Sequence, residues 1–337
     1  MNKRSNKKSK PGSAPNRREF FLTGAAAAAA CLAPGVTAAR GEERFCPLPM
    51  SPLPCRPLGR TGALLPLLTF GGGGAWLSLT EDLALRILSE AIDQGVISID
   101  TAYSYGDGKS ERIIGTLMPS RRNEVLIHTK VATRDKARWW KELETSLKRL
   151  RVDYVDTLMI HHLEQGDDLA LLEAREGPLE MLLKAKEQKL TRWVGVSCHT
   201  DSAVLARLVR QWPLDHVMVS LNVATNDYSD MGFEEVALPE LVSRGIGITA
   251  MKLMGTGRIV DTHPDFDYRT CLRYTLSLPV TGATITMPNL QFLQRNIEAV
   301  KAFAPFSQAD MLRIKEKAAR EVRTSFYEFM KNHRDEA

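Results

Sequence analysis

IDTAYSYGDGKSERIIG, residues 99–115, joins the end of a strand-like run to a loop and then to a helical pattern. Asp100 ends the apolar run, and Tyr105 follows five residues later in the loop. Two later strand-like runs also end in a titratable side chain, Lys130 in EVLIHTKV and His161 in YVDTLMIHH. Strands that alternate with helices and carry polar groups at their carboxyl ends are typical of an α/β fold with its site at that end.

The alternation of strand and helix occurs eight times along the chain. Eight such units predict a (β/α)8 TIM barrel, which typically takes about 250 residues and fits a chain of 337 residues with 44% hydrophobic content. We expect a proline-rich linker and N-terminal segment over residues 40–60, the barrel over 61–304, and a C-terminal helical extension over 305–337 with one helix over 308–332. The predicted strands span residues 67–70, 96–101, 124–131, 155–162, 193–197, 217–221, 246–253 and 283–287.

The four titratable groups suit the reduction of a carbonyl group. Hydride transfer leaves an alkoxide, so a proton donor must lie beside the oxygen as negative charge develops. A free phenol has a pKa of about 10, and a neighbouring ammonium such as that of Lys130 lowers the pKa of a tyrosine by stabilising phenolate. Asp100 can hold that ammonium in place, and His161 can orient the carbonyl. Each residue alone also fits a structural role, so the set of four indicates the site.

On these residues the chain resembles the aldo/keto reductase superfamily. The matching motifs are Asp-Thr-Ala-x-x-Tyr-Gly with Asp100 and Tyr105, His-Thr-Lys with Lys130, and the strand end after SLKRLRVDYVDTLMI with His161. The resemblance covers residues 56–304 approximately. It implies an NAD(P)H-dependent oxidoreductase that reduces an aldehyde or ketone, or oxidises the alcohol. It also implies Asp100, Tyr105, Lys130 and His161 as the catalytic residues, with Tyr105 as general acid and base.

The resemblance also implies where the nicotinamide lies. The family's Ser-Asn motif on the fifth strand stands here as Ser197-Cys198. Met218 occupies the place of a Gln that holds the nicotinamide amide, and Met251 falls near the place of a stacking aromatic residue. Methionine can cover a flat ring but cannot donate the hydrogen bonds of an amide. The sequence therefore departs from the family at the nicotinamide while keeping the catalytic set.

The phosphate and adenine side is also partly matched. Gly255-Thr256-Gly257 suits a backbone cradle for pyrophosphate, although a simple strand-exit turn has the same pattern. Asn296 matches the family's adenine-facing Asn, whereas Arg295 stands where a Glu is expected. NADP is the cofactor that the resemblance implies, and NAD stays open. The predicted cofactor-binding residues are Ser197, Cys198, Gly255, Thr256, Gly257, Asn289 and Asn296.

Residues 1–39 predict an export signal. They carry seven Lys or Arg against one Glu, a net charge of +6, while the whole chain carries +5. The remainder is nearly neutral, which removes the composition argument for nucleic-acid binding. The pair Arg17-Arg18, an alanine-rich run and small residues at 37–39 fit a twin-arginine (Tat) signal peptide. We therefore expect a periplasmic or exported protein that meets the Tat machinery. The short apolar run argues against a stable membrane span, which needs about 20 apolar residues.

The cysteines leave alternatives open. Cys31 follows a partial lipoprotein cleavage box, so lipidation there is an alternative to simple cleavage. Cys46 and Cys55 flank a proline-rich stretch, where they form either a disulfide in an oxidising compartment or two free thiols. No close Cys-x-x-Cys pair occurs, and we expect neither a zinc site nor an iron–sulfur cluster.

Two other functions compete with the reductase. A catalytically reduced nicotinamide-binding sensor or partner protein is favoured by Met218 and Met251 and opposed by the intact catalytic set. A metal-dependent barrel hydrolase would use histidines on the third to fifth strands, but the first strand ends in glycines where such enzymes carry His-x-His. The sequence does not identify the carbonyl substrate. The histidines available to the hydrolase are His128, His161, His162 and His199.

Overall fold

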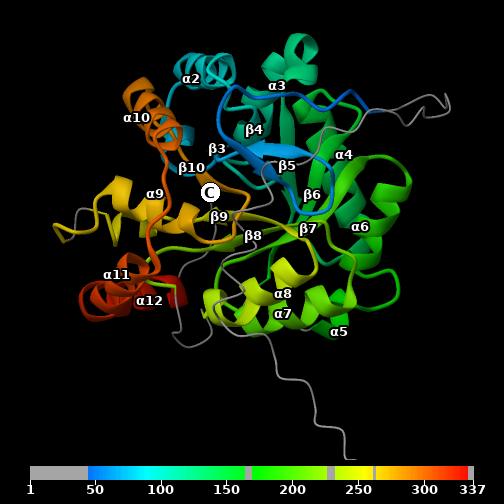
Figure 1. The fold of residues 1–337 in the computed structure, drawn as a ribbon. Helices are drawn as coiled ribbons and strands as arrows, with labels where there is room; N and C mark the ends of the chain where they lie inside the picture. The colour runs from blue at the N-terminus through cyan, green and yellow to red at the C-terminus, as the bar shows by residue number, and fades with distance from the viewer. Residues whose placement is uncertain (1–44, 164–168, 226–231, 261–262, 333–337) are drawn as a thin grey trace, which may run out of the picture. The chain divides into compact units, whose positions relative to one another are not determined.

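Eight parallel strands close into a barrel, as the sequence predicts (Figure 1). The computed structural model describes residues 45–163, 169–225, 232–260 and 263–332. Each strand pairs in parallel with its neighbours in chain order, and the last pairs with the first to close the ring. The barrel strands are β3 (Leu68–Gly71), β4 (Ser98–Asp100), β5 (Leu126–Val131), β6 (Val155–Leu163), β7 (Thr191–Cys198), β8 (His216–Ser220), β9 (Gly247–Met251) and β10 (Gly282–Ile285).

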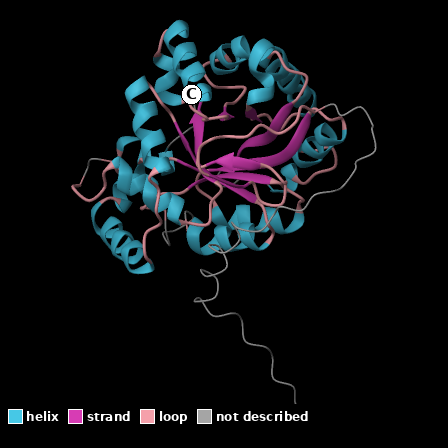
Figure 2. Cartoon of the chain, turned by 45° about the horizontal axis from the view of Figure 1, so that its top comes forward, coloured by secondary structure: helices cyan, strands magenta, loops and turns pink. Residues whose placement is uncertain are grey.

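Amphipathic helices surround the strands, as Figure 2 shows in cyan around magenta. In α4 (Lys136–Leu150), Leu143 and Leu150 lie two turns apart on the same face and are buried, so packing stabilises the helix. Asp135 begins that helix by accepting a hydrogen bond from the N–H of Arg138. The main helices are α2 (Glu81–Asp93), α3 (Lys109–Arg121), α4 (Lys136–Leu150), α5 (Leu169–Leu172), α6 (Pro178–Glu187), α7 (Ser202–Gln211), α8 (Leu238–Ser243), α9 (Tyr268–Ser277) and α10 (Leu290–Lys301). The short helical turns are η2 (Gly74–Ser78), η3 (Arg122–Glu124), η5 (Phe233–Ala237) and η6 (Gly255–Gly257).

A β-hairpin covers the amino-terminal end of the barrel. It consists of β1 (Cys55–Pro57) and β2 (Leu64–Pro66), which pair antiparallel. Its side chains Leu58 and Leu65 form a small core with Leu126 and Trp193 at the starts of two barrel strands. The opposite, carboxyl end of the barrel is therefore the end left for a site.

The described part of the predicted linker packs on the barrel. Ser51 donates a hydrogen bond to the carbonyl of Gly95, and Arg56 donates to the carbonyls of Leu276 and Val280. Cys46 and Cys55 are both free thiols in this structure, so the disulfide that the sequence left open is not formed here.

The C-terminal extension corrects one detail of the prediction. The sequence predicts one helix over residues 308–332, but the structure has two, α11 (Gln308–Glu321) and α12 (Arg323–Asn332). The helix breaks at Val322, whose backbone leaves the helical region with φ −128° and whose side chain is buried. Phe326 and Met330, which follow on α12, are also buried.

The predicted export signal lies outside the described residues, as do Arg17, Arg18 and Cys31. Among the residues that the structure does describe, no helix combines the length and the apolar character needed to cross a bilayer.

Candidate active site

Three of the four predicted catalytic residues stand at the carboxyl ends of neighbouring strands. Asp100 ends β4, Lys130 is the penultimate residue of β5, and His161 lies near the end of β6. Tyr105 lies in the loop between β4 and α3. All four are buried, with exposed fractions between 1% for Lys130 and 9% for Tyr105.

Lys130 is the centre of this group. Its ammonium lies 2.6 Å from Oδ1 of Asp100, and it donates hydrogen bonds to the carbonyl of Thr101 at 2.8 Å and to the hydroxyl of Tyr105 at 3.4 Å. The ammonium also lies 4.8 Å from the centre of the tyrosine ring. A buried cation held this close favours negative charge on the phenol oxygen.

The backbone at Gly73 packs closely against the ring of Tyr105. A Cβ atom on Gly73 would lie 3.1 Å from Cε2 of Tyr105, so a larger residue in the loop after β3 would press on that ring. On its other side the tyrosine ring meets the imidazole of His161 edge to face, with centroids 5.5 Å apart. The glycines after the first strand therefore make room for the tyrosine, a function that the sequence pattern did not reveal.

Glu111 and Arg149 support the tyrosine loop, and the sequence analysis missed both. Glu111 is fully buried one turn into α3 and accepts a hydrogen bond from the hydroxyl of Thr129 at 2.8 Å. Arg149 from α4 lies 3.4 Å from Glu111 and donates to the carbonyl of Tyr103 at 3.0 Å. Burial raises the pKa of Glu111, while Ser146, Thr129 and Arg149 oppose the rise. A carboxylate within an otherwise apolar helix face is the only hint of this link in the sequence.

At the carboxyl end of the barrel, the rings of His161, His162 and His199 follow one another in contact, and His161 contacts Tyr105. The pairing of β6 with β7 shifts between Ile160 and Leu163, and this irregularity on β6 coincides with His161 and His162. Their ring centroids lie 5.3 Å apart, and His162 stacks on His199 at 4.7 Å with the planes nearly parallel. Arg134 donates a hydrogen bond to the carbonyl of His162 at 2.7 Å, which fixes the irregular segment.

His128 does not join these histidines. Its two ring nitrogens lie 3.0 Å from Oγ of Ser98 and 2.9 Å from Oγ1 of Thr157, in the barrel interior. Burial, with the charges of Lys130 and Arg122, lowers its pKa to about 3, so the ring is neutral. Among the described residues no group of three or more His, Cys, Asp or Glu side chains is arranged to hold a metal ion. The histidine set of the hydrolase alternative is therefore divided between two places.

The predicted nicotinamide residues lie on neighbouring strands. The hydroxyl of Ser197 is buried and donates to the carbonyl of Ile160 at 3.4 Å. The thiol of Cys198 is buried in the main core and lies 3.3 Å from the carbonyl of Asp201. The cluster that faces the barrel interior here is apolar and consists of Met159, Met218 and Met251. Met159 pairs in register with Lys130, which places this cluster beside the predicted catalytic residues.

The predicted phosphate and adenine residues follow the last two strands. Gly255, Thr256 and Gly257 form η6 after β9, and Asn289 begins α10 by accepting a hydrogen bond from the N–H of Phe292. Asn296 lies on α10 and is buried; its amide donates to the carbonyl of Phe292. Its Oδ1 is buried and accepts no hydrogen bond within the described part of the chain. An acceptor of this kind fits a ligand that brings its own donor, such as an adenine amine.

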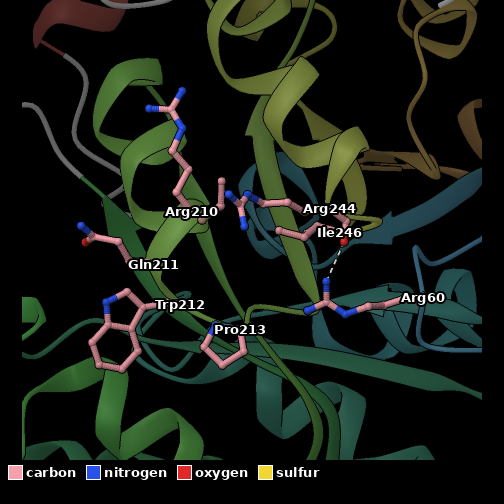
Figure 3. Close-up of a pocket in the computed structure, with 8 residues that line it drawn as sticks. Arg60, Arg210, Gln211, Trp212, Pro213, Arg244 and Ile246 are labelled. Carbon is pink, nitrogen blue, oxygen red and sulfur yellow. Dashed lines mark hydrogen bonds between the residues drawn. The ribbon is translucent and has the colours of Figure 1, made fainter.

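A surface pocket of about 400 Å³ lies elsewhere, next to the amino-terminal ends of β8 and β9 (Figure 3). Arg60 donates to the carbonyl of Arg244 at 2.6 Å and to that of Leu214 at 3.0 Å. Arg210 and Arg244 both approach Glu240. The arginines of this pocket therefore bind backbone carbonyls and the carboxylate of Glu240. The pocket lies at the opposite end of the barrel from Lys130.

The chain resembles known proteins in sequence and in fold. The Aldo/keto reductase family model matches residues 68–270, more than half of the chain. Aldo-keto reductase YhdN of Bacillus subtilis is 36% identical over 102 residues, which cover 27% of this chain and 31% of that protein. L-galactose dehydrogenase of Arabidopsis thaliana is 26% identical over 227 residues, covering 64% of this chain and 70% of that enzyme.

Solved structures show the same fold. An aldo-keto reductase from Klebsiella pneumoniae in complex with NADPH superposes with a TM-score of 0.66 at 21% identity, covering 79% of this chain and 96% of that one. The chain therefore belongs to the aldo/keto reductase family of oxidoreductases.

Proposed function

We propose that the protein is an NADPH-dependent reductase of an aldehyde or ketone, which also oxidises the corresponding alcohol. The observation that carries the proposal is the contact of one buried ammonium, that of Lys130, with both Asp100 and the hydroxyl of Tyr105. Family membership supports the reaction class. The substrate class in this proposal is a small-molecule carbonyl compound.

A dinucleotide bound at this site would supply the hydride that reduces the carbonyl carbon. Tyr105 donates its hydroxyl proton to the carbonyl oxygen, and the alcohol leaves with both hydrogens. Lys130 stabilises the phenolate that remains, and Asp100 keeps the ammonium oriented. His161, whose ring meets Tyr105 edge to face, orients the carbonyl. The tyrosine then takes a proton from water before the next turnover.

Residues after β9 and on α10 fit the two ends of the cofactor's dinucleotide. The buried acceptor Oδ1 of Asn296 and the loop Gly255–Gly257 fit the adenine and pyrophosphate of a dinucleotide. Met218 and Met251 offer an apolar surface to the nicotinamide. The Klebsiella relative was solved with NADPH, which supports NADP over NAD.

A titration of the purified protein with NADPH and NADH tests this proposal. We expect quenching of nucleotide or protein fluorescence with tighter binding of NADPH, and loss of NADPH absorbance with at least some members of a panel of aldehydes and ketones. Binding of NADPH without consumption across the panel would favour the sensor alternative, which Met218 and Met251 support. Absence of binding to either nucleotide would contradict the proposal.

We also propose that the Tat pathway exports the protein to the periplasm, with its dinucleotide bound before export. The pair Arg17-Arg18 and the alanine-rich run that follows support this route. The double variant Arg17→Lys, Arg18→Lys should remain in the cytoplasm when cells are fractionated. Equal periplasmic amounts of both forms would contradict the export route. An exported form that carries no dinucleotide by mass analysis would contradict loading before export.

A further inference from the structure

The loop after β9 has an unusual backbone. Four of its residues have positive φ angles, Lys252 at 58°, Gly255 at 58°, Thr256 at 52° and Gly257 at 83°. For Lys252 and Thr256 this left-handed conformation costs free energy, because the side chain crowds the backbone. Such a conformation persists only where surrounding contacts hold it. We call residues 252–258 the β9 loop.

Helix α12 packs against the β9 loop at Gly255 and Arg258. Phe326 is almost fully buried, and a Cβ atom on Gly255 would lie 3.1 Å from its ring, so the helix packs directly against the glycine backbone. Phe329, one turn further along α12, lies under the guanidinium of Arg258, with 4.7 Å between the guanidinium carbon and the ring centroid. One end of the β9 loop is thus fixed by two aromatic rings of one helix.

Helix α11 fixes the surroundings of the same loop. Lys317 pairs with Asp265, which follows the β9 loop along the chain. Lys315 pairs with Glu234 and Glu235 of η5, and Glu234 also accepts a hydrogen bond from Tyr274 at 2.6 Å. Figure 1 shows α11 and α12, in red, beside the yellow segment that follows β9.

The other end of the β9 loop is fixed by the barrel. Asn222, buried after β8, donates its amide to the carbonyl of Lys252 at 3.0 Å. The chain between Lys252 and Arg258 is therefore held at both ends, by the barrel and by α12. The outward residues Thr256, Gly257 and Arg258 are exposed. A loop held in this way offers its backbone N–H groups in a fixed arrangement, which lowers the entropy cost of binding an anion.

We propose that α11 and α12 form a brace that keeps the β9 loop in its dinucleotide-binding conformation, and that Phe326 and Phe329 are positioning residues for the cofactor. The inference rests on the proposed function, in which this loop takes the pyrophosphate. Both helices lie beyond residues 68–270, the part of the chain that the family model matches. The brace acts on the affinity and residence time of the dinucleotide and leaves proton transfer at Tyr105 unchanged.

The test compares Phe329→Ala with a matched control. Phe303→Ala removes another half-buried phenylalanine that lies under an arginine, Arg56, at 5.4 Å, away from the β9 loop. We expect the Kd for NADPH to rise about tenfold in Phe329→Ala through faster dissociation, the size of one partly desolvated cation–π contact. Phe303→Ala should bind NADPH as the unaltered protein does. The rate of a single turnover at saturating NADPH should stay within about twofold of the unaltered protein in both variants.

Two further measurements separate a brace from a general loss of stability. Phe329→Tyr keeps the ring and should restore the affinity. Hydrogen exchange of the amides of residues 252–258, measured without nucleotide, should be faster in Phe329→Ala than in Phe303→Ala. If exchange and nucleotide dissociation are the same in both variants while the unaltered protein binds NADPH, the brace is wrong and the proposed function stands. If the unaltered protein binds no dinucleotide, the proposed function fails and the brace fails with it.

Discussion

Two layers of side chains fill the barrel interior, two residues apart on the same strands, and they differ in chemistry. The lower layer is a chain of hydrogen bonds with no formal charge, whereas the upper layer holds the ion pair of Lys130 with Asp100 beside three methionines. In the lower layer, Ser98 lies two residues before Asp100 and His128 two before Lys130. The chain of hydrogen bonds runs through Thr69, Ser98, His128, Thr157, His216 and Thr249.

On the proposed function, the lower layer contributes to stability and the upper layer to the reaction. Each ring nitrogen of His128 and His216 meets a hydroxyl, so the lower layer satisfies its own polar groups. Burial lowers the pKa of both histidines, and they stay neutral. The upper layer instead keeps a buried charge next to a phenol. Substitutions in the upper layer should therefore change turnover, and those in the lower layer should change stability.

The largest expected effect is that of Tyr105→Phe. Reduction should slow by about 10²–10⁴-fold, because only the proton donor is removed. The Kd for NADPH should stay nearly unchanged, since the ring remains. Tyr103→Phe, which removes a hydroxyl two residues away, serves as the control and should keep its activity. Near-normal turnover of Tyr105→Phe would show that another group donates the proton.

Lys130→Met should slow reduction by about 10²-fold and move the pH dependence of the reaction to higher pH. The shift is expected because the phenol loses the cation that stabilises its ionised form. The variant also leaves Asp100 buried without its partner, which destabilises the fold. The double variant Asp100→Asn, Lys130→Met separates the two effects, since it should recover stability while the pH profile stays shifted. An unmoved profile in both variants would make Lys130 a structural residue.

The lower layer should make the fold sensitive to acid. The folded state holds His128 neutral with a pKa of about 3, whereas the unfolded chain binds this proton below its ordinary value of 6.5. Stability is therefore constant above that value and falls as the pH drops towards 3, by about 2 kcal/mol at pH 5 for this residue alone. Urea unfolding at pH 7 and pH 5 measures the loss. His128→Gln should reduce this acid-dependent loss of stability by that amount.

Thr249→Val tests the hydrogen bonds of the lower layer without removing a titratable group. It removes the hydroxyl that meets Nε2 of His216 at 2.9 Å and leaves that ring nitrogen buried without its partner. We expect a loss of about 1–3 kcal/mol in the free energy of unfolding, with turnover unchanged. A large loss of turnover at full stability would show that the lower layer takes part in the reaction.

Much of the fold was predictable, because strands buried on both faces give apolar runs separated by helical periods. The eight predicted strands correspond to β3–β10, and their ends differ by a few residues. The break at Val322 was not predictable, since the amphipathic pattern continues through residues 308–332. Val322, Phe326 and Met330 follow one another at four-residue spacing across the break, so the pattern of buried residues gives no sign of it.

For the candidate site, the sequence pointed to four residues that the structure brings together, but not to the side chains that surround them. The positions of Asp100, Lys130 and His161 at the carboxyl ends of strands indicated the site, because these ends meet at one end of a barrel. Both histidines lie on apolar strands, and in the sequence only their place along the strand separates them, inside the strand for His128 and at its end for His161. The structure separates them by partners, with hydroxyls around one and the tyrosine ring beside the other. The contact of Glu111 with Arg149 joins two helices and has no local signature either.

The most direct test of the division between layers is a single-turnover measurement of NADPH oxidation at saturating nucleotide. It compares the unaltered protein with Tyr105→Phe and His128→Gln, using the carbonyl compound that is reduced fastest. We predict that His128→Gln oxidises NADPH at nearly the normal rate despite lower stability, whereas Tyr105→Phe binds NADPH and oxidises it at least about 10²-fold more slowly. A fast Tyr105→Phe together with a slow, folded His128→Gln would contradict the account.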